Sequence, residues 1–269
     1  MIGLIYSEND TVSKAAGEHV LQEHESEIDE WKGFARIGEI VLCKSKTDLL
    51  HCEYLDGFGF DSLLIVSRHK SEKGVVSFTA HSTGNWTNRA DFGGMPMKLS
   101  IAEPLGMREF LLGMTRERNE GIDVIYEATH HGPLLKTPSC FLEFGGPTSV
   151  MGNSQRSALL GRIAFDCAMK LAEKHAEIGK VAIGIGGTHY ANKFTRLAVE
   201  KEYAFSHIMP KHAIINKGPF ENISMIEAAV DCSGIPPECA VIDWKSMNSE
   251  LRGDIIKKLD DIGLDYERI

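Results

Sequence analysis

The sequence predicts an α/β layer fold, in which helices cover a sheet. Short apolar runs alternate with amphipathic segments over most of the 269 residues, which is typical of this class. The hydrophobic content of 43% is ordinary for a chain that buries a full core. No internal repeat, low-complexity tract or long linker interrupts the pattern. We therefore expect a single domain over residues 1–269.

Nine short apolar runs are strand candidates, because runs of this length rich in Val, Ile and Phe fit buried strands. They cover residues 2–6, 39–43, 62–67, 75–80, 123–129, 139–144, 181–187, 205–209 and 240–244. The connection between the third and fourth runs is too short for a parallel crossover, which favours a hairpin. In such a hairpin, His69 and His81 would lie roughly 17 Å apart at strand rise. We therefore expect that these two histidines do not contact one ion.

Amphipathic segments predict four helices between the strands, over residues 11–22, 100–118, 153–175 and 246–263. The second begins with a capping box of Ser100 and Glu103, with Pro104 in the tolerated first turn. The last stops at Gly263, a favourable residue just past a helix end. Residues 80–100 are rich in Gly, Asn and Ser and predict a long loop, which we interpret as a lid or substrate loop.

Charge and cysteine usage narrow the class of protein. The net charge of −9 argues against a protein that coats nucleic acid by general electrostatics, although residues 67–73 and 192–201 are locally basic. The six cysteines form no CxxC pair, and several lie inside apolar patterns, which favours a reduced protein inside the cell. No signal-like N-terminus or long apolar stretch is present. We expect a cytoplasmic protein that does not contact membranes.

Histidines gather at the ends of the predicted strands. Six of the eleven lie at or near such positions: His69, His81, His130, His131, His189 and His207. Each alone is explained by a structural role, but independent structural residues have no reason to prefer strand ends. Because the carboxyl ends of parallel strands share one edge, we expect these side chains to converge there on a shared polar site.

The adjacent pair His130 and His131 raises a geometric question. Neighbouring residues of an extended strand point to opposite faces, so both can bind one metal only if the backbone turns. Gly132 and Pro133 supply such a turn. We interpret the pair as two different roles in one site rather than as a double ligand.

Two other segments carry candidate chemistry. Glu143 lies among apolar residues, where a carboxylate is costly unless it is paired or metal-bound, and a raised pKa would suit a general base. The alternative is a Glu exposed on an edge strand. In "IGIGGTHY", Gly186 and Gly187 allow a sharp turn, Thr188 can cap the following helix, and His189 follows at its first turn. Free N–H groups there favour an oxyanion. The segment lacks the full GxGxxG pattern of a dinucleotide site.

The chain contains no GxSxG elbow, P-loop or catalytic cysteine context. A histidine-rich site with a carboxylate remains, and imidazole and carboxylate are ligands that zinc accepts. The sequence therefore predicts a zinc hydrolase that activates water for attack on an ester or amide.

Five segments in order, "SRHKSEKG", "AHSTGNW", "EATHHGP", "FLEFGG" and "IGIGGTHY", resemble the archaeal and plant type of D-aminoacyl-tRNA deacylase. The resemblance runs from "GLIYSENDT" to about residue 216. It implies a three-layer α/β/α domain of the phosphorylase/hydrolase-like kind, with a mixed, mostly parallel sheet as in peptidyl-tRNA hydrolase. It also implies zinc dependence and hydrolysis of the ester that joins a D-amino acid to the tRNA 3′ end, a form of chiral proofreading.

The resemblance carries over to His69, His81, Asn85, His130, His131, Glu143, Gly186, Gly187 and His189. Within this set, we expect one or two zinc ions on His69, His130, His131 and His189. Glu143 or His81 would take the proton of the attacking water, and the N–H groups of residues 187–189 would stabilise the oxyanion. The expected contacts to the acceptor end of the tRNA are Arg68, Lys70, Asn85, Gly186, Gly187, Tyr190, Lys193 and Arg196. We expect a monomer that does not bind DNA.

Two other functions stay open on the sequence. One is a zinc-dependent amidohydrolase or carboxypeptidase-like enzyme that acts on small N-acyl amino acids and ignores tRNA. The other is a non-catalytic protein that binds the tRNA end, with its histidines in structural roles; a more basic chain would be expected for it.

Overall fold

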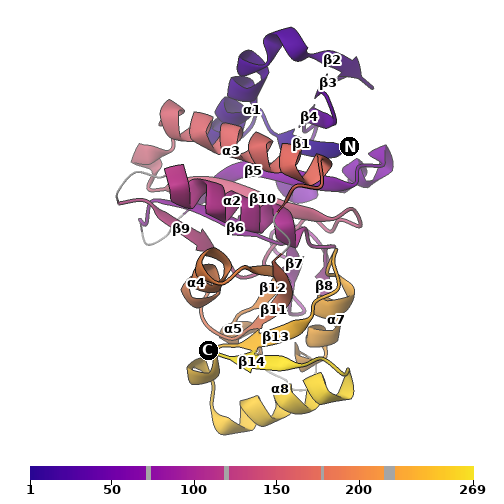
Figure 1. Ribbon diagram of the computed structural model, residues 1–269, viewed down its shortest axis with the longest axis vertical. Helices are drawn as coiled ribbons and strands as arrows, with labels where there is room; N and C mark the ends of the chain where they lie inside the picture. Colours follow the sequence, from indigo (N-terminus) through magenta and orange to yellow (C-terminus); the bar gives the residue numbers. More distant parts are fainter. Residues whose placement is uncertain (71–73, 118–120, 177–178, 215–221) are drawn as a thin grey trace.

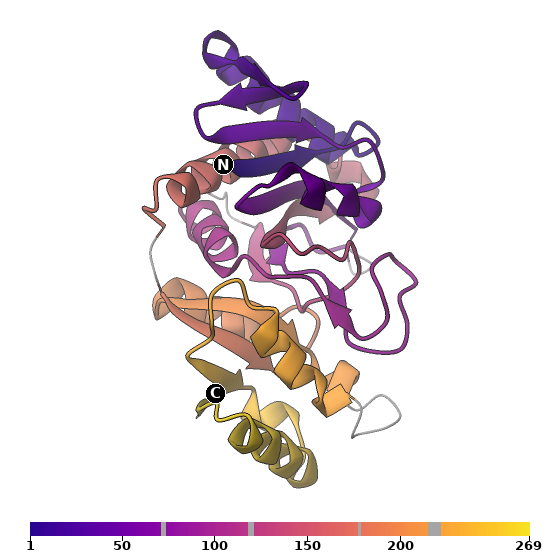
Figure 2. The ribbon, with the colours of Figure 1, turned by 90° about the vertical axis from the view of Figure 1, so that its right-hand side faces the viewer.

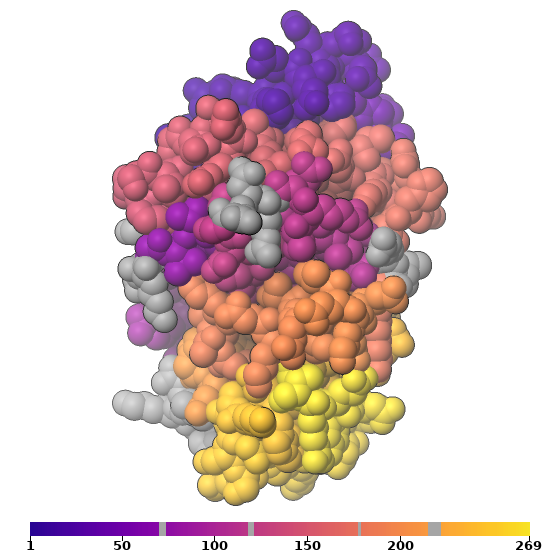
Figure 3. Space-filling model, turned by 60° about the vertical axis from the view of Figure 1, so that its left-hand side comes forward, coloured from indigo at the N-terminus to yellow at the C-terminus, as the bar shows by residue number. Residues whose placement is uncertain are grey.

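The structure is a computed structural model that describes residues 1–70, 74–117, 121–176, 179–214 and 222–269. The molecule is elongated, with the N-terminal segments at one end and the C-terminal segments at the other (Figure 1; Figure 3). An eight-stranded sheet forms the N-terminal part and a four-stranded sheet forms the C-terminal part. Two short strands, β7 (Gly84–Asn85) and β8 (Lys98–Leu99), pair beside them.

The larger sheet has the order β2 (Asp29–Trp31), β3 (Phe34–Ile37), β4 (Ile40–Lys44), β1 (Ile2–Tyr6), β5 (Ser62–Lys70), β10 (Ser139–Gly146), β6 (Ser77–His81) and β9 (Asp123–Tyr126). The smaller sheet has the order β12 (Tyr203–Met209), β11 (Lys180–Ile185), β13 (Cys239–Ile242) and β14 (Tyr266–Arg268). All pairs of the smaller sheet are parallel, as are β4, β1, β5 and β10 in the larger one. The mixed, mostly parallel sheet is thus confirmed, and all nine predicted runs form strands.

The α-helices of the described part are α1 (Thr11–Glu23), α2 (Pro104–Glu117), α3 (Ser154–Ala172), α4 (Asn192–Glu200), α5 (Lys211–Ile214), α7 (Met225–Asp231) and α8 (Ser249–Asp261). Helices α1, α2 and α3 cover one face of the larger sheet, where Leu4, Val66 and Leu142 are buried (Figure 1). Helix α4 continues this layer over β12. Helices α7 and α8 pack on the other face of the smaller sheet. Helices therefore lie on both sides, as predicted.

The second face of the larger sheet is covered differently. Its buried residues Ile5, Ile65 and Phe141 pack against two short 3₁₀ segments, Leu49–His51 and Glu53–Phe58. This face of the larger sheet is therefore covered by short 3₁₀ segments and not by an α-helix.

The predicted hairpin of residues 62–67 and 75–80 is wrong. Strand β10 lies between β5 and β6, parallel to the first and antiparallel to the second. Residue Glu143 of β10 therefore stands between Ser67 and Thr79 in register. Sequence neighbours joined by a short connection are separated because a later segment inserts between them.

The predicted capping box is also wrong, whereas the predicted end of the last helix is confirmed. Helix α2 begins at Pro104, and the hydroxyl of Ser100 instead donates to the carbonyl oxygen of Pro133 at 2.8 Å. The carboxylate of Glu103 accepts hydrogen bonds from the backbone N–H groups of residues 105 and 106, so it caps the helix itself. Helix α8 ends at Asp261, and Gly263 follows with a φ of 68°.

Candidate active site

Glu143 is the centre of the polar cluster on this open face. Ser67 and Thr79, its register neighbours, donate hydrogen bonds to its two carboxylate oxygens at 2.5 and 3.2 Å. His69 lies two residues beyond Ser67, and His81 lies two residues beyond Thr79. Because β5 and β6 run in opposite directions, the two imidazoles approach Glu143 from opposite sides, at 3.5 Å and 3.7 Å from Oε2. The expectation that His69 and His81 lie far apart is therefore wrong.

The surroundings of Glu143 also exclude one alternative and correct one expectation. Its strand is central rather than at an edge, and only 4% of the residue is exposed. Burial raises the pKa of Glu143, but the interactions with His69 and His81 outweigh burial and hold that pKa well below its usual value. Glu143 is therefore ionised, not the neutral acid that a raised pKa would give. Burial lowers the pKa of His69 and of His81, yet pairing with Glu143 leaves both above the ordinary value.

Three imidazoles present free nitrogen atoms to one another. The Nδ1–H groups of His81, His130 and His131 donate to the backbone carbonyls of residues 82, 128 and 132, at 3.1, 2.9 and 2.5 Å. A carbonyl oxygen can only accept, so Nδ1 carries a proton in each ring, and Nε2 keeps a lone pair wherever the ring is neutral. One ligand atom of each ring lies within 4.8 Å of the others. This is the arrangement in which metal-binding histidines are held by backbone carbonyls.

The turn after His130 brings both adjacent histidines to the same place. His131 has a φ of 41°, in the left-handed region, and its ring centroid lies 4.3 Å from that of His130. Burial, and then the neighbouring imidazoles, lowers the pKa of His130 well below its usual value and that of His131 to about 4. Both rings are therefore neutral at neutral pH, as a metal ligand must be.

Glu127 is the site residue that the sequence analysis missed. It is buried, and within the described part of the chain neither of its carboxylate oxygens has a hydrogen-bond partner. Three imidazoles surround it: His69 Nδ1 at 3.3 Å, His189 Nε2 at 3.6 Å and His130 Nε2 at 3.9 Å. A buried carboxylate without hydrogen bonds is costly unless a cation neutralises it. Its position at the end of an apolar strand, three residues before His130, was the available signal.

The residues present fit a divalent cation such as zinc. Three overlapping groups each bring their ligand atoms within 4.8 Å: His81, His130 and His131; Glu127, His130 and His189; and His69, Glu127 and Glu143. The unpartnered Glu127 oxygens and the unpartnered Nε2 of His81 lie inside these groups. Imidazole nitrogen with carboxylate oxygen is a donor set that zinc accepts. All four histidines predicted as metal ligands lie here, with Glu127 added.

The histidines converge on a face of the sheet rather than along its carboxyl edge. His69 and His81 end strands that run in opposite directions, so no common edge joins them. The close approach at this face needs a glycine: a Cβ at Gly145, the register partner of His69, would lie 1.7 Å from the His69 carbonyl oxygen.

Within the glycine turn of residues 186 and 187, the N–H of Gly187 is not free to act as one of the predicted oxyanion donors. Gly186 and Gly187 have φ values of 99° and 75°, so the sharp turn is present. However, the N–H of Gly187 donates to the Ser246 hydroxyl at 3.0 Å, and that of Gly186 donates to the Met209 carbonyl at 2.8 Å. Both donors are therefore used within the protein.

The segment after this turn positions His189 instead. Helix α4 begins only at Asn192, and the Thr188 hydroxyl donates to the carbonyl of Tyr190 rather than capping the helix. The carbonyl of His189 accepts from the N–H of Ala128 at 2.8 Å, which ties this histidine to the strand end that carries Glu127. Tyr190 places its hydroxyl 2.9 Å from Nε2 of His69 and so orients that ring.

The residues predicted to contact tRNA differ in their exposure and in their partners within the protein. Arg68 is exposed beside the site, whereas Lys193 is paired with Asp243 at 2.6 Å. Arg196 is exposed on α4 and lies 3.9 Å from Glu200. The side chain of Lys70 lies outside the described part of the structure. The amide of Asn85 donates to two carbonyls of the loop between β7 and β8.

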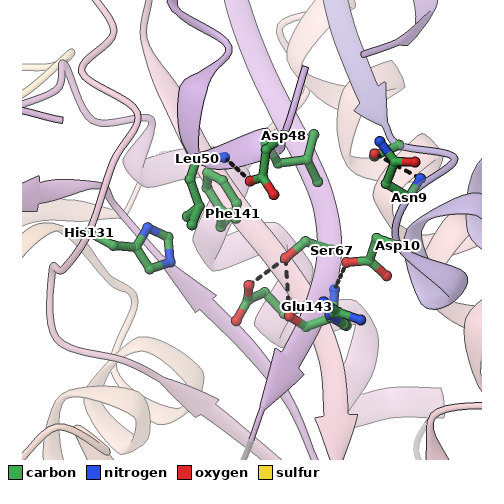
Figure 4. Close-up of a pocket in the computed structure, with 11 residues that line it drawn as sticks. Asn9, Asp10, Asp48, Leu50, Ser67, His131, Phe141 and Glu143 are labelled. Atoms are coloured by element: carbon green, nitrogen blue, oxygen red, sulfur yellow. Dashed lines mark hydrogen bonds between the residues drawn. The ribbon is translucent and has the colours of Figure 1, made fainter. Parts of the chain in front are cut away.

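A pocket of about 160 Å³ adjoins the cluster and opens between the start of α1 and the 3₁₀ segment of residues 49–51. His131 lines it at one side and Asn9 and Asp10 at the other, with Ser67 and Glu143 between them, as Figure 4 shows. The remaining lining combines polar and apolar side chains: Ser7, Asp48, Leu49, Leu50, Ser67, Arg68 and Phe141. It offers space for a small organic group next to the candidate catalytic residues.

His207, in contrast, has a structural role. Its Nε2–H faces the carbonyls of Ser100 and Cys232, each at 3.2 Å, and Nδ1 lies 3.2 Å from the Thr129 hydroxyl. Burial lowers the pKa of His207 to about 4, so this fully buried ring is neutral and satisfied within the protein.

Comparison with known proteins shows the family. The model of the D-aminoacyl-tRNA deacylase family matches residues 57–267, well beyond residue 216. The D-aminoacyl-tRNA deacylase of Ignicoccus hospitalis is 36% identical over 205 residues, which cover 76% of this chain and 80% of that protein. The D-aminoacyl-tRNA deacylase of Pyrococcus horikoshii is 33% identical over 237 residues, which cover 85% of this chain and 84% of that protein. A crystal structure described as a conserved protein of unknown function, AF0625, is similar with a TM-score of 0.87 and 27% sequence identity. The match covers 100% of this chain and 95% of that chain. The chain belongs to the D-aminoacyl-tRNA deacylase family.

Proposed function

We propose that the protein hydrolyses the ester bond of D-aminoacyl-tRNA, which releases the D-amino acid and free tRNA. Membership of the family and the names of its relatives support this substrate. The observation that carries the hydrolytic chemistry is Glu127, a buried carboxylate with two unpartnered oxygens among three imidazoles.

The cofactor we propose is one zinc ion, held by Glu127, His130 and His189, with His69 beside them. When bound, zinc polarises the ester carbonyl and lowers the pKa of water. A second ion at His81, His130 and His131 would occupy Nε2 of His81, which then could not accept a proton. His131 stays neutral and forms the wall of the pocket that faces Asn9 and Asp10.

His81 and Glu143 are proposed to handle the proton of the attacking water. In the neutral ring, which carries its proton on Nδ1, Nε2 of His81 has a lone pair and no hydrogen-bond partner among the described residues, so it can accept that proton. Glu143, ionised and fixed by Ser67 and Thr79, faces the same nitrogen at 3.7 Å and stabilises the imidazolium that forms. The proton then passes to the ribose oxygen as the ester bond breaks.

The adjoining pocket is proposed to take the side chain of the D-amino acid. Leu49, Leu50 and Phe141 offer apolar contact, and Asn9 and Asp48 offer polar partners farther out. With the carbonyl fixed at the cluster, inversion at the α-carbon exchanges the directions of the side chain and the hydrogen. An L-side chain would then point away from the pocket, so the pocket discriminates by handedness.

We also propose that the protein acts in the cytoplasm as a monomer and contacts only the acceptor end of the tRNA. Among the described residues, no helix is long and apolar enough to cross a membrane. A net charge of −9 suits a small contact with RNA rather than an extended one. Arg68 at the pocket provides local positive charge for that contact.

Hydrolysis of three substrates, with and without chelator, tests the proposed function. We expect the protein to release D-tyrosine from D-tyrosyl-tRNA, to act at least about 100-fold more slowly on L-tyrosyl-tRNA, and to leave N-acetyl-tyrosine intact. Thorough chelation should remove the activity, and added zinc should restore it.

Other results would reject this assignment. Turnover of N-acetyl-tyrosine without any effect on tRNA would identify a small-molecule amidohydrolase. Binding of tRNA without hydrolysis or zinc would identify a non-catalytic tRNA-end-binding protein.

A further inference from the structure

The loop between β7 and β8, residues 86–97, carries the large hydrophobic side chains that the described part of the protein exposes. Phe92 is 68% exposed and Met95 is 55% exposed. Figure 2 shows this loop, in purple, projecting at the edge of the molecule. An exposed phenylalanine forgoes the stabilisation of roughly 1.5–3 kcal/mol that its burial would provide, so a use for it outside the fold is worth testing.

The backbone of this loop is nevertheless held firmly. At its base, Trp86 is buried and its indole N–H donates to the Thr129 carbonyl at 2.8 Å. The N–H of Met97 donates to the carbonyl oxygen of Thr87 at 2.9 Å and so joins the two ends of the loop. Inside it, the Asn85 amide donates to the carbonyls of Gly93 and Met95, at 3.0 and 3.3 Å. These hydrogen bonds anchor the backbone that carries the exposed ring of Phe92.

The loop is also attached to the candidate active site. The carbonyl of Phe92 accepts a hydrogen bond from the N–H of Gly132, the residue after His131, at 2.9 Å. A Cβ at Gly93 would lie 2.3 Å from the carbonyl oxygen of Leu50, so the loop also contacts the pocket wall. The backbone of Phe92 therefore lies beside two segments that contribute His131 and Leu50 to the pocket.

This position matches the chemistry of an aminoacyl-tRNA end. The scissile ester is on the terminal ribose, and the terminal base is attached to the same ribose. When the ester lies at the histidine cluster, the base must lie at the rim. A fixed, exposed aromatic ring is the side chain on which proteins stack unpaired bases.

We propose that Phe92 is the stacking platform for the terminal adenine of the tRNA, an assignment that rests on the proposed function. The structure offers this ring in place of an extended basic surface. Stacking adds affinity without positive charge, which suits a chain of net charge −9.

Binding of uncharged RNA tests this directly, without any need for hydrolysis. The probes are a short hairpin RNA that ends in CCA and the same RNA with an abasic terminal ribose. We expect the native protein to bind the CCA end about 5- to 100-fold more tightly than the abasic end, the range that stacking on an aromatic ring gives. Phe92→Ala should bind both ends equally, and Phe92→Trp should restore the preference.

Met95→Ala is the matched control, because it removes an exposed apolar side chain of the same loop that has no aromatic face. It should keep the preference for the CCA end. A Phe92→Ala protein that still prefers the CCA end, or a native protein that binds both ends equally, would overturn the assignment. If the native protein shows this preference and Phe92→Ala loses it, the stacking role of Phe92 is supported even when D-aminoacyl-tRNA is not hydrolysed. The two proposals can therefore fail separately.

Discussion

Glu127→Gln is expected to abolish zinc binding and D-aminoacyl-tRNA hydrolysis together. The carboxylate is buried among His69, His130 and His189, and its charge is what a cation there would neutralise. A neutral amide of the same shape removes that attraction. Loss of a residue that only supports a metal ligand costs about 10- to 100-fold in affinity, so loss of a ligand should cost more than about 100-fold.

Metal content and thermal unfolding measure this effect. Zinc present at about 1,000 times its dissociation constant should stabilise the native protein by about 4 kcal/mol and should leave Glu127→Gln unchanged. Glu103→Gln is the matched control: that carboxylate is also buried, but Ser62 and the start of α2 satisfy it. The control should lose some stability and keep its zinc. Full zinc occupancy in Glu127→Gln would contradict the assignment of the ligand.

Glu143→Gln is expected to have an equally large effect on turnover but none on zinc content. The low pKa of Glu143 means that it faces His81 as a carboxylate, and the amide cannot stabilise an imidazolium. Loss of positioned proton transfer costs about 10²- to 10⁴-fold in kcat. Single-turnover hydrolysis of D-tyrosyl-tRNA, with zinc measured on the same sample, separates the two roles.

Thr79→Val is the control for this variant. It removes one hydrogen bond to the Glu143 carboxylate, at 3.2 Å, and keeps the negative charge. We expect a much smaller loss of turnover than in Glu143→Gln, because the charge remains and the Ser67 hydroxyl still donates to it, with a stability cost of about 1.5–3 kcal/mol for a hydrogen bond to a charged group. Zinc loss in Glu143→Gln would show that Glu143 is a ligand and that the proposed division of roles is wrong.

The periodicity of the sequence predicts the elements well but not their neighbours in space. Every predicted strand is present, because a run such as residues 62–67 is apolar on both faces and fits only a buried strand. The hairpin failed because β10, from much later in the chain, pairs between β5 and β6. Register depends on such long-range pairing, and no local pattern encodes it. For this reason the sequence did not predict that His69 and His81 contact one carboxylate, that of Glu143.

In the candidate site, too, local features were predicted from the sequence and spatial partners were not. Five of the six strand-end histidines converge, whereas His207 does not. The backbone turns at His131, with a φ of 41°, one residue before the predicted Gly132. Glu127 was missed because a carboxylate at the end of an apolar run resembles an ordinary exposed strand end. The Gly187 N–H was misassigned because its partner, Ser246, lies 59 residues away. Whether a buried polar atom is satisfied depends on tertiary contacts, which only the structure supplies.

Titration of zinc into the metal-free protein tests the central claim most directly, with zinc occupancy and D-tyrosyl-tRNA hydrolysis followed in the same samples. The account predicts no hydrolysis before zinc is added, a rate that rises in proportion to occupancy, and saturation of both at one zinc per chain. Full hydrolysis by the metal-free protein, or full occupancy without hydrolysis, would contradict it.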